Sequence, residues 1–466
     1  MKKLLSLLLC GMFGLAVFLT GCGNGLTNVE NTEKGIIYNG GSVAMVGDYL
    51  FFANGFASDH ASMEDMAAYN NATKYAGLNR VQKDNVNSAT LYAPSDKVEK
   101  VSQNDLVGMA QTYMFAYGDN LYYVAPTTHK TNENKIAFDH LSVFKINYNG
   151  TGRSEIFYTE SAFDTTNGKI VALEYNNVAY IMIYDGANLV TIDITNGGTK
   201  TNLDEVTSVA FPQEYADWNG VLYFTKDADA STSGNEVYQI KVDGTNETQL
   251  TREGELSETV KFIERYDDQV FFTMGEEGAE VSHTYLADAS DIDSSFFTAA
   301  GEIYYYSAIS DVIKVCTEES LSRLAGFIFT SNGVVMYQNE FTQEDPQVLI
   351  DSSTYSNAKV IAAIGEYVYF STASGIYKVS LSTKQIVELV TEMTITTGVC
   401  GYTYQMLDGE KVALDKIYFY AQREYDEEDE DVDTSDENVY LYQVSANGGD
   451  VKMVGDPIEV ETKEEE

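Results

Sequence analysis

The feature that most constrains this chain is a short β-hairpin pattern that recurs along most of its length. A short apolar strand is followed by a tight turn and then by a strand of aromatic and β-branched residues. The turns contain Gly, Asn or Asp, which tolerate the backbone that a two-residue hairpin requires. Copies of the pattern occupy residues 43–52, 113–124, 171–183, 215–224, 262–272, 299–307, 327–337, 360–370 and 412–420.

The strand after each turn is apolar at consecutive positions, as in Leu50-Phe51-Phe52 and Val368-Tyr369-Phe370. A strand with one face in water would alternate between apolar and polar residues, so continuous apolarity indicates that both faces are covered. The intervals between the hairpins lack helical periodicity. We therefore expect each sheet to pack between two other sheets rather than between helices.

A second hairpin fills the intervals, and its copies lie at residues 143–159, 189–203, 237–251, 376–391 and 439–455. Two hairpins make a unit of four antiparallel strands. Units of this size recur every 40–50 residues or so in β-propellers, where radial stacking buries both faces of each sheet. The sequence thus predicts an all-β protein with a β-propeller fold.

The number of blades follows less directly. Three copies of the first hairpin between 299 and 370 are too closely spaced for full blades, so the stretch from 267 to 365 is expected to hold two. This predicts eight blades, with seven as the alternative. We also expect Ile36-Ile37-Tyr38 to close the ring by adding to the final blade. A short helical insertion is predicted at residues 59–84.

The amino terminus has the pattern of an export signal. Lys2 and Lys3 precede an apolar run from Leu4 to Leu19, which is short for a membrane-spanning helix. The run ends in Leu19-Thr20-Gly21-Cys22, which resembles the lipobox of bacterial lipoproteins. That resemblance implies diacylglycerol on Cys22 and cleavage before it. Two or three acyl chains hold a protein on a membrane durably.

This reading divides the chain into four parts. They are a lipoprotein signal peptide (1–21), a lipid-anchored flexible tether (22–35), the propeller (36–458) and an acidic disordered tail (459–466). The protein is expected on the extracytoplasmic face of the cell membrane. The lipobox, the GDYLFF-like and NGVLYF-like hairpins and the VYQIKVDGTNETQLT-like hairpins together resemble bacterial lipoproteins with a low-density-lipoprotein-receptor-related-like β-propeller domain, loosely related to TolB-type propellers. These motifs are structural and imply a fold rather than an activity.

The net charge of −42 repels phosphate, which argues against nucleic acid as a partner. Part of this charge lies in the acidic segment 424–437. Hard cations prefer several oxygen ligands, so weak Ca²⁺ binding is one interpretation of this segment. It lacks the ligand spacing and central Gly of a calcium loop, and a solvated, self-repelling loop is the favoured alternative. The candidate ligands are Asp426, Glu427, Glu428, Asp429, Glu430, Asp431 and Asp433.

Chemistry-bearing motifs are otherwise missing. The chain has no GxSxG, HExxH, CxxC or GxxxxGK[ST] motif, and its four His residues share no pattern. Cys316 and Cys400 would remain in the mature chain, either as a disulfide or as two buried thiols. We therefore predict no catalytic residue, metal or other cofactor. The expected role is a non-catalytic scaffold that binds a protein or glycan at the cell envelope. The alternative is a carboxylate-based enzyme, or an enzyme accessory, acting on polysaccharide or peptide.

Overall fold

The computed structural model of the chain describes most of the strands and turns of the predicted propeller. The described residues are 26–33, 35–54, 77–87, 89–91, 95, 97–102, 105, 113–127, 129, 139–211, 220–227, 235–249, 259–266, 269–275, 282–288, 302–306, 309–317, 320–331, 334–338, 347–395, 400–407, 410–423 and 439–455.

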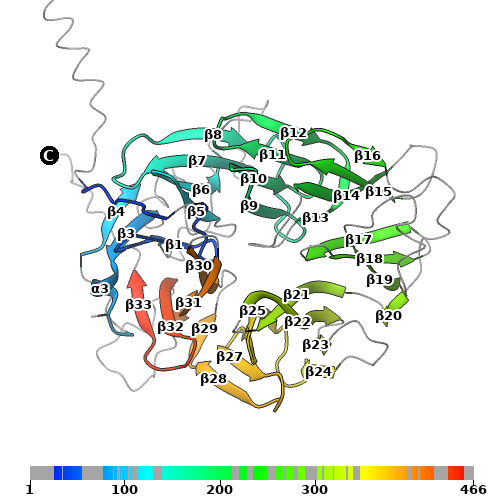
Figure 1. The fold of residues 1–466 in the computed structure, drawn as a ribbon. Coiled ribbons are helices and arrows are strands. Elements are labelled where there is room, and N and C mark those ends of the chain that lie inside the picture. The colour runs from blue at the N-terminus through cyan, green and yellow to red at the C-terminus, as the bar shows by residue number, and fades with distance from the viewer. Residues whose placement is uncertain are drawn as a thin grey trace, which may run out of the picture.

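The described strands form eight four-stranded antiparallel units around a central axis, so the protein is an eight-bladed β-propeller (Figure 1). In most blades the first strand lies nearest the axis and the fourth lies at the rim. Blades 1 to 4 comprise β1 (Val43–Val46), β2 (Tyr49–Ala53), β3 (Leu78–Gln82) and β4 (Glu99–Ser102); β5 (Met114–Tyr117), β6 (Asn120–Pro126), β7 (Leu141–Asn147) and β8 (Ser154–Tyr158); β9 (Lys169–Tyr175), β10 (Val178–Tyr184), β11 (Leu189–Asp193) and β12 (Thr199–Leu203); and β13 (Val206–Ala210), β14 (Val221–Asp227), β15 (Asn235–Lys241) and β16 (Thr248–Gln249).

Blades 6 and 7 are joined by one parallel pairing, between Cys316 and Ile364, into a single eight-stranded sheet. In blade 8 an additional strand, β30 (Cys400–Leu407), pairs with β31. Blades 5 to 8 comprise β17 (Thr259–Tyr266), β18 (Gln269–Gly275), β19 (Ser282–Asp288) and β20 (Glu302–Tyr306); β21 (Ile309–Thr317), β22 (Ser320–Ser331), β23 (Val334–Gln338) and β24 (Gln347–Ile350); β25 (Lys359–Ile364), β26 (Tyr367–Thr372), β27 (Gly375–Ser380) and β28 (Ile386–Val390); and β29 (Met393–Ile395), β31 (Glu410–Arg423), β32 (Tyr440–Ser445) and β33 (Lys452–Gly455).

Consecutive apolar residues in the second strands are buried on opposite sides of the blade, as the sequence predicts. In β2, Leu50 and Phe52 pack against blade 8, whereas Phe51 packs against blade 2. The same division occurs in β10, where Ile181 contacts the cluster shared with blade 2 and Met182 the cluster shared with blade 4. Because side chains alternate across a strand, one apolar run supplies two interfaces.

Several predicted hairpins are confirmed, including β1–β2, β5–β6, β9–β10 and β25–β26. At the β9–β10 turn Asn176 and Asn177 both have positive φ, 52° and 59°, as the tight hairpin turn requires. Two blades, the fifth and the sixth, indeed occupy the stretch between the turns at 267 and 365.

Four copies of the pattern differ from the prediction, and one of them, 412–420, forms no hairpin but lies within the single strand β31. The inner strand of blade 4 is Val206–Ala210. In the 215–224 copy, residues 215–219 lie outside the described part of the chain, and the residues that follow belong to the second strand, Val221–Asp227. Residues 302–306 form the fourth strand of blade 5, and the 327–337 copy joins the second and third strands of blade 6. A local hairpin pattern does not distinguish the two hairpins of a blade, because both bury similar apolar residues.

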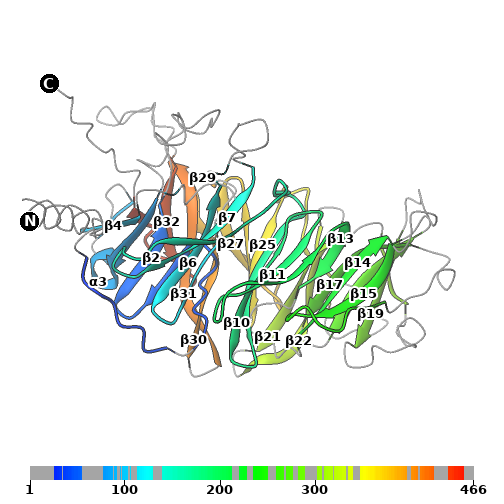
Figure 2. The same ribbon diagram turned by 90° about the horizontal axis from the view of Figure 1, so that it is seen from above.

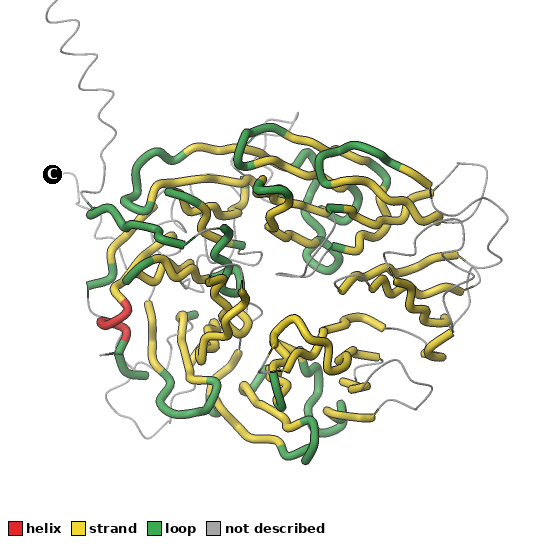
Figure 3. The backbone as a smooth tube through the Cα atoms, in the orientation of Figure 1, coloured by secondary structure: helices red, strands yellow, loops and turns green. Residues whose placement is uncertain are grey.

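The predicted helical insertion at 59–84 is wrong at its carboxyl end, and residues 55–76 lie outside the described part. Leu78–Gln82 form strand β3, which pairs along its whole length with β2. The one helix among the described residues is α3 (Lys83–Val86), a single turn that follows β3 (Figure 3). No described helix is long and apolar enough to cross a membrane.

The ring closes differently from the prediction. Ile37 does not add to the final blade. It pairs instead with Ala116 in β5, through backbone hydrogen bonds of 2.8 and 2.9 Å. Blades 1 and 8 each supply four strands of their own, and their facing side chains close the ring. The closing cluster consists of Val43, Leu50, Phe52, Val81, Val86, Tyr418, Tyr420, Val439, Leu441 and Val454.

Candidate functional site

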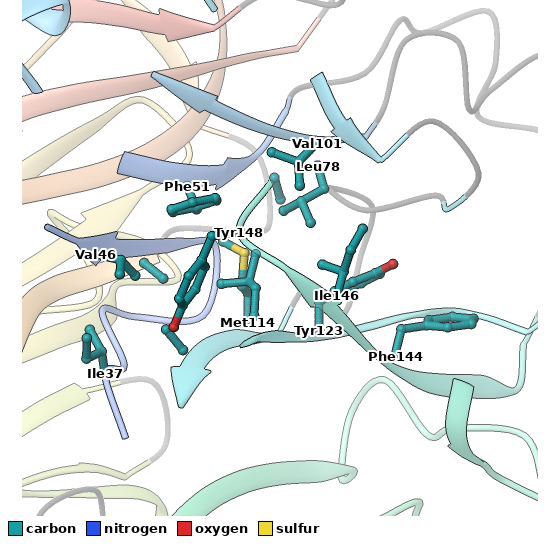
Figure 4. Close-up of a cluster of buried hydrophobic side chains, with 14 of the residues drawn as sticks. Ile37, Val46, Phe51, Leu78, Val101, Met114, Tyr123, Phe144, Ile146 and Tyr148 are labelled. Atoms are coloured by element: carbon teal, nitrogen blue, oxygen red, sulfur yellow. The ribbon is translucent and has the colours of Figure 1, made fainter. Parts of the chain in front are cut away.

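The junction of blades 1 and 2 differs from the other described junctions because two arginines lie in it beside an apolar cluster. The cluster includes Phe51 and Leu78 from blade 1 and Met114 and Ile146 from blade 2 (Figure 4). Buried charges are costly unless they are paired and hydrogen-bonded. The hydrogen-bond partners of the two arginines therefore show which parts of the chain meet at this junction.

Arg80, in β3, has no exposed surface. Its Nε donates to Glu99 Oε2 of β4 at 2.7 Å, and its Nη1 donates to the carbonyl oxygens of Thr27 (2.7 Å) and Tyr148 (3.0 Å). Its guanidinium also lies 4.6 Å from the centre of the Tyr49 ring. One side chain thereby joins blade 1, blade 2 and the segment that precedes the propeller.

Arg153, in the turn between β7 and β8, forms a two-bond contact with the carboxylate of Asp105. Arg153 Nε donates to Oδ2 at 2.7 Å, and Nη2 donates to Oδ1. Tyr123 Oη and Ser102 Oγ donate to Oδ2 at 2.5 and 3.1 Å. Asp105 is 1 % exposed, so these four donated bonds compensate its loss of hydration. Ser102 ends blade 1, so the cluster joins blades 1 and 2.

The surroundings of Arg153, Tyr123 and Tyr148 favour the protonated form of each side chain. Hydrogen bonding to Asp105 raises the pKa of Arg153, although burial opposes that shift. Burial raises the pKa of Tyr123, and the Asp105 charge raises it further. Burial also raises the pKa of Tyr148. Both phenols are therefore neutral donors at physiological pH.

The amino-terminal segment, residues 26–33, lies against this junction. Asn28 Oδ1 accepts a hydrogen bond from Asn149 Nδ2 at 2.6 Å, in the β7–β8 turn. Further along, Asn31 Nδ2 donates to the Gly118 carbonyl at 3.0 Å, in the β5–β6 turn. Leu26 and Val29 pack against the apolar cluster. The segment thus runs from the outer half of blade 2 toward the axis, which it reaches where Ile37 pairs with β5.

This arrangement differs from the predicted flexible tether over 22–35. Residues 26–33 have no regular secondary structure, yet they are held by side-chain and carbonyl contacts. The segment also lies close to the β1–β2 turn, because a Cβ added to Gly47 in that turn would be 3.2 Å from the Glu30 carbonyl oxygen. Of the predicted tether, residues 22–25 and 34 lie outside the described part of the chain.

The two ends of the described strands define two faces of the ring (Figure 2). We call the face that carries the β1–β2, β5–β6 and β7–β8 turns the turn face, and the segment 26–33 lies on it. On the opposite face, here the loop face, the chain leaves β2, β6 and β31 and returns in β3, β7 and β32. The connections there are 54–77, 127–140 and 424–439, much longer than the two-residue β1–β2 and β5–β6 turns and the six-residue β7–β8 turn. They belong to blades 1, 2 and 8, which are neighbours.

The described part of the 127–140 connection includes two of the four histidines. His129 stacks on Tyr158 with ring centres 4.2 Å apart, and its Nε2 lies 2.8 Å from Glu155 Oε1. His140 contacts Asp139 and the Glu160 carbonyl instead. The two histidines therefore have separate partners, on the outer side of blade 2.

Among the residues that the structure describes, no three His, Cys, Asp or Glu side chains are grouped so that they could hold a metal ion. The carboxylate of Asp105 is engaged in joining blades 1 and 2, and that of Glu99 is paired with Arg80 within blade 1. The charged side chains of the junction therefore connect blade 1, blade 2 and the amino-terminal segment 26–33.

The sequence-predicted site residues mostly fall elsewhere. Cys22 and the acidic residues Asp426 to Asp433 lie outside the described residues. Cys316 and Cys400 lie in β21 and β30, and their side chains are outside the described part, so the disulfide stays a prediction. Sequence reasoning missed Arg80, Asp105 and Arg153. The available signal was Arg80 itself, a charged residue in a short segment that also contains the apolar Leu78 and Val81.

The chain matches no protein-family model and no curated protein. Among solved structures it is similar to a prolyl endopeptidase, at 9 % identity and a TM-score of 0.45 over 74 % of this chain and 50 % of that chain. It is also similar to a structure from a nidogen–laminin complex (10 %, 0.33, 54 % and 89 %) and to TolB from Acinetobacter baumannii (11 %, 0.33, 58 % and 64 %). The chain spans about half the length of the prolyl endopeptidase chain. Such low identities and TM-scores carry no argument about function.

Proposed function

We propose that this protein is a lipid-anchored, extracytoplasmic scaffold whose propeller binds a protein or glycan at the cell envelope without catalysing a reaction. The observation that carries the proposal is the division of the ring into two unlike faces. The turn face of blades 1 and 2 holds the amino-terminal segment and the connection 83–98, which includes α3, whereas the strands of blades 8, 1 and 2 are joined on the loop face by the connections 424–439, 54–77 and 127–140. A rigid ring whose loop face is not covered by the amino-terminal segment is suited to recognition through its connections.

Anchoring is supported by the Leu19-Thr20-Gly21-Cys22 pattern after a basic and apolar leader. The intact mass of the protein extracted from membranes tests it. We expect a chain that begins at residue 22 and carries the added mass of diacylglycerol. Cys22→Ala should keep residues 1–21 and gain no lipid. Cys10→Ala is the matched control, because it changes a cysteine inside the leader and should be processed normally. An unmodified residue 22 in the wild-type protein would refute anchoring.

The binding role is tested by comparing the two faces of one blade in cells. A photoreactive residue replaces Asp139 on the loop face or Asp119 on the turn face, and both positions are exposed. We expect a discrete, dose-dependent covalent adduct from position 139 and none of the same size from position 119. Equal adduct formation from both faces would count against a partner surface formed by the loops.

A further inference from the structure

The docked amino-terminal segment bears on how the ring is oriented, a question that membrane anchoring alone leaves open. A long flexible tether would let any face of a propeller approach the lipid. In the described part of the chain, the first residues that contact the ring are Leu26 and Thr27, and Leu26 lies only four residues after Cys22. An extended chain spans at most about 3.5 Å per residue, so these four residues reach about 14 Å.

That reach is shorter than the height of a blade. Strand β6 of blade 2 has seven residues, and at roughly 3.3 Å per residue it is about 23 Å long from the turn face to the loop face. A lipid attached at Cys22 therefore cannot pass along blade 2 to the loop face while residues 26–33 stay docked.

The docking contacts are strong enough to hold the segment in place. Arg80 is buried and donates two hydrogen bonds to Thr27, one to its carbonyl oxygen at 2.7 Å and one to Oγ1 at 3.3 Å. Asn28 and Asn31 add contacts to two separate turns of blade 2. Leu26 and Val29 remove apolar surface from water. Detaching the segment would also leave the Arg80 guanidinium without two of its acceptors.

We propose that the turn face of blades 1 and 2 lies against the membrane and that the loop face points away from it. The ring is then presented in one orientation, with the strand ends on the loop face of blades 8, 1 and 2 directed away from the bilayer. This inference rests on the proposed lipid anchor at Cys22. Its partner is the surface of the bilayer, and the docked segment 26–33 is the element that sets the geometry.

The proposal is tested with the full lipidated protein in liposomes that carry a fluorescence quencher on the lipid headgroup. A dye is attached to Asp119→Cys or to Asp139→Cys, a matched pair on the two faces of blade 2, with Cys316 and Cys400 replaced by alanine. We expect at least twofold stronger quenching at position 119 than at position 139. Equal quenching, or stronger quenching at 139, would overturn the orientation.

A linker variant isolates the role of the short tether. Twenty Gly and Ser residues inserted between Gly25 and Leu26 leave the docking contacts intact but lengthen the reach well beyond one blade. We expect the difference between positions 119 and 139 to fall to less than half its wild-type value. An unchanged difference would show that the tether does not set the orientation. The intact mass of each sample reports the lipid separately, so a missing lipid refutes the anchor, whereas a lipidated but unoriented protein refutes this inference alone.

Discussion

The junction between blades 1 and 2 and the junction that closes the ring between blades 8 and 1 perform the same task with different chemistry. Both contain a cluster of buried apolar residues. At the closing junction, described polar contacts to backbone carbonyls include Tyr420 Oη to Ala53 at 2.7 Å and Lys452 Nζ to Asn87 at 2.5 Å. At the other, Arg80 and Arg153 are paired with Glu99 and Asp105.

The difference between the two junctions indicates a role for the charged side chains Arg80 and Arg153. In the described part of the closing junction, apolar packing is combined with hydrogen bonds to backbone carbonyls. The junction of blades 1 and 2 has a third participant, the segment 26–33, which offers carbonyl oxygens and no regular strand. A guanidinium presents five donors in a rigid fork, so Arg80 can serve all three parts at once.

The largest expected effect comes from breaking the buried pair at this junction. Arg153→Met should lower the free energy of unfolding by about 3–5 kcal/mol, because it leaves the charge of Asp105 buried with hydroxyl donors only. Chemical denaturation measures this loss. The double variant with Asp105→Leu removes the buried charge as well and should recover a substantial part of it. A loss below about 1 kcal/mol for the single variant would contradict the comparison.

The closing junction should respond as an apolar core does. Leu441→Ala should cost about 2–4 kcal/mol, because Leu441 is fully buried between blades 8 and 1 and its truncation leaves a cavity. Thermal and chemical unfolding both report it. Val387→Ala at the rim is the control and should change stability by less than about 0.5 kcal/mol, since that side chain is 40 % exposed. Equal effects of the two variants would argue against closure by this cluster.

A smaller effect is expected when the docked segment alone is loosened. Asn31→Ala removes the 3.0 Å hydrogen bond to the Gly118 carbonyl and should cost about 1 kcal/mol. Hydrogen exchange should accelerate in residues 27–33 and stay unchanged in β6 and β7. Thr32→Ala, an exposed position in the same segment, provides the control. Acceleration throughout blades 1 and 2 would mean that the segment is part of the blade core.

The smallest effect concerns a charge on an exposed turn, which contrasts with the buried pairs. Hydrogen bonds from Ser382 and Ser380 lower the pKa of Glu366. Its stabilising effect is therefore present above the unfolded pKa of about 4.3 and is lost as the pH falls through the folded pKa. Because Glu366 is exposed, Glu366→Gln should cost less than about 1 kcal/mol at pH 7. This difference from wild type should vanish in acid, and a difference that grows in acid would contradict the assignment.

Much of the architecture follows from local pattern. Leu50-Phe51-Phe52 requires two covered faces wherever it is placed, and the Asn176-Asn177 turn requires adjacent strands to pair. Eight four-stranded units and their order along the chain follow from repetition of these signals. The roles of individual copies do not, as the 302–306 strand shows, because inner and outer hairpins have the same local composition.

The candidate site depended on contacts between residues far apart in the chain. Arg80 meets Tyr148, and Arg153 meets Asp105, only because blades 1 and 2 are stacked. Ile37 pairs with Ala116 because the inner edge of β5 is within its reach, while the last blade already has its own fourth strand. The amino-acid sequence alone determined a ring of doubly covered sheets, since side-chain alternation is a property of each strand. Which charges became buried, and where the amino-terminal segment docks, was decided by the tertiary structure, since burial and partner choice depend on which blades become neighbours.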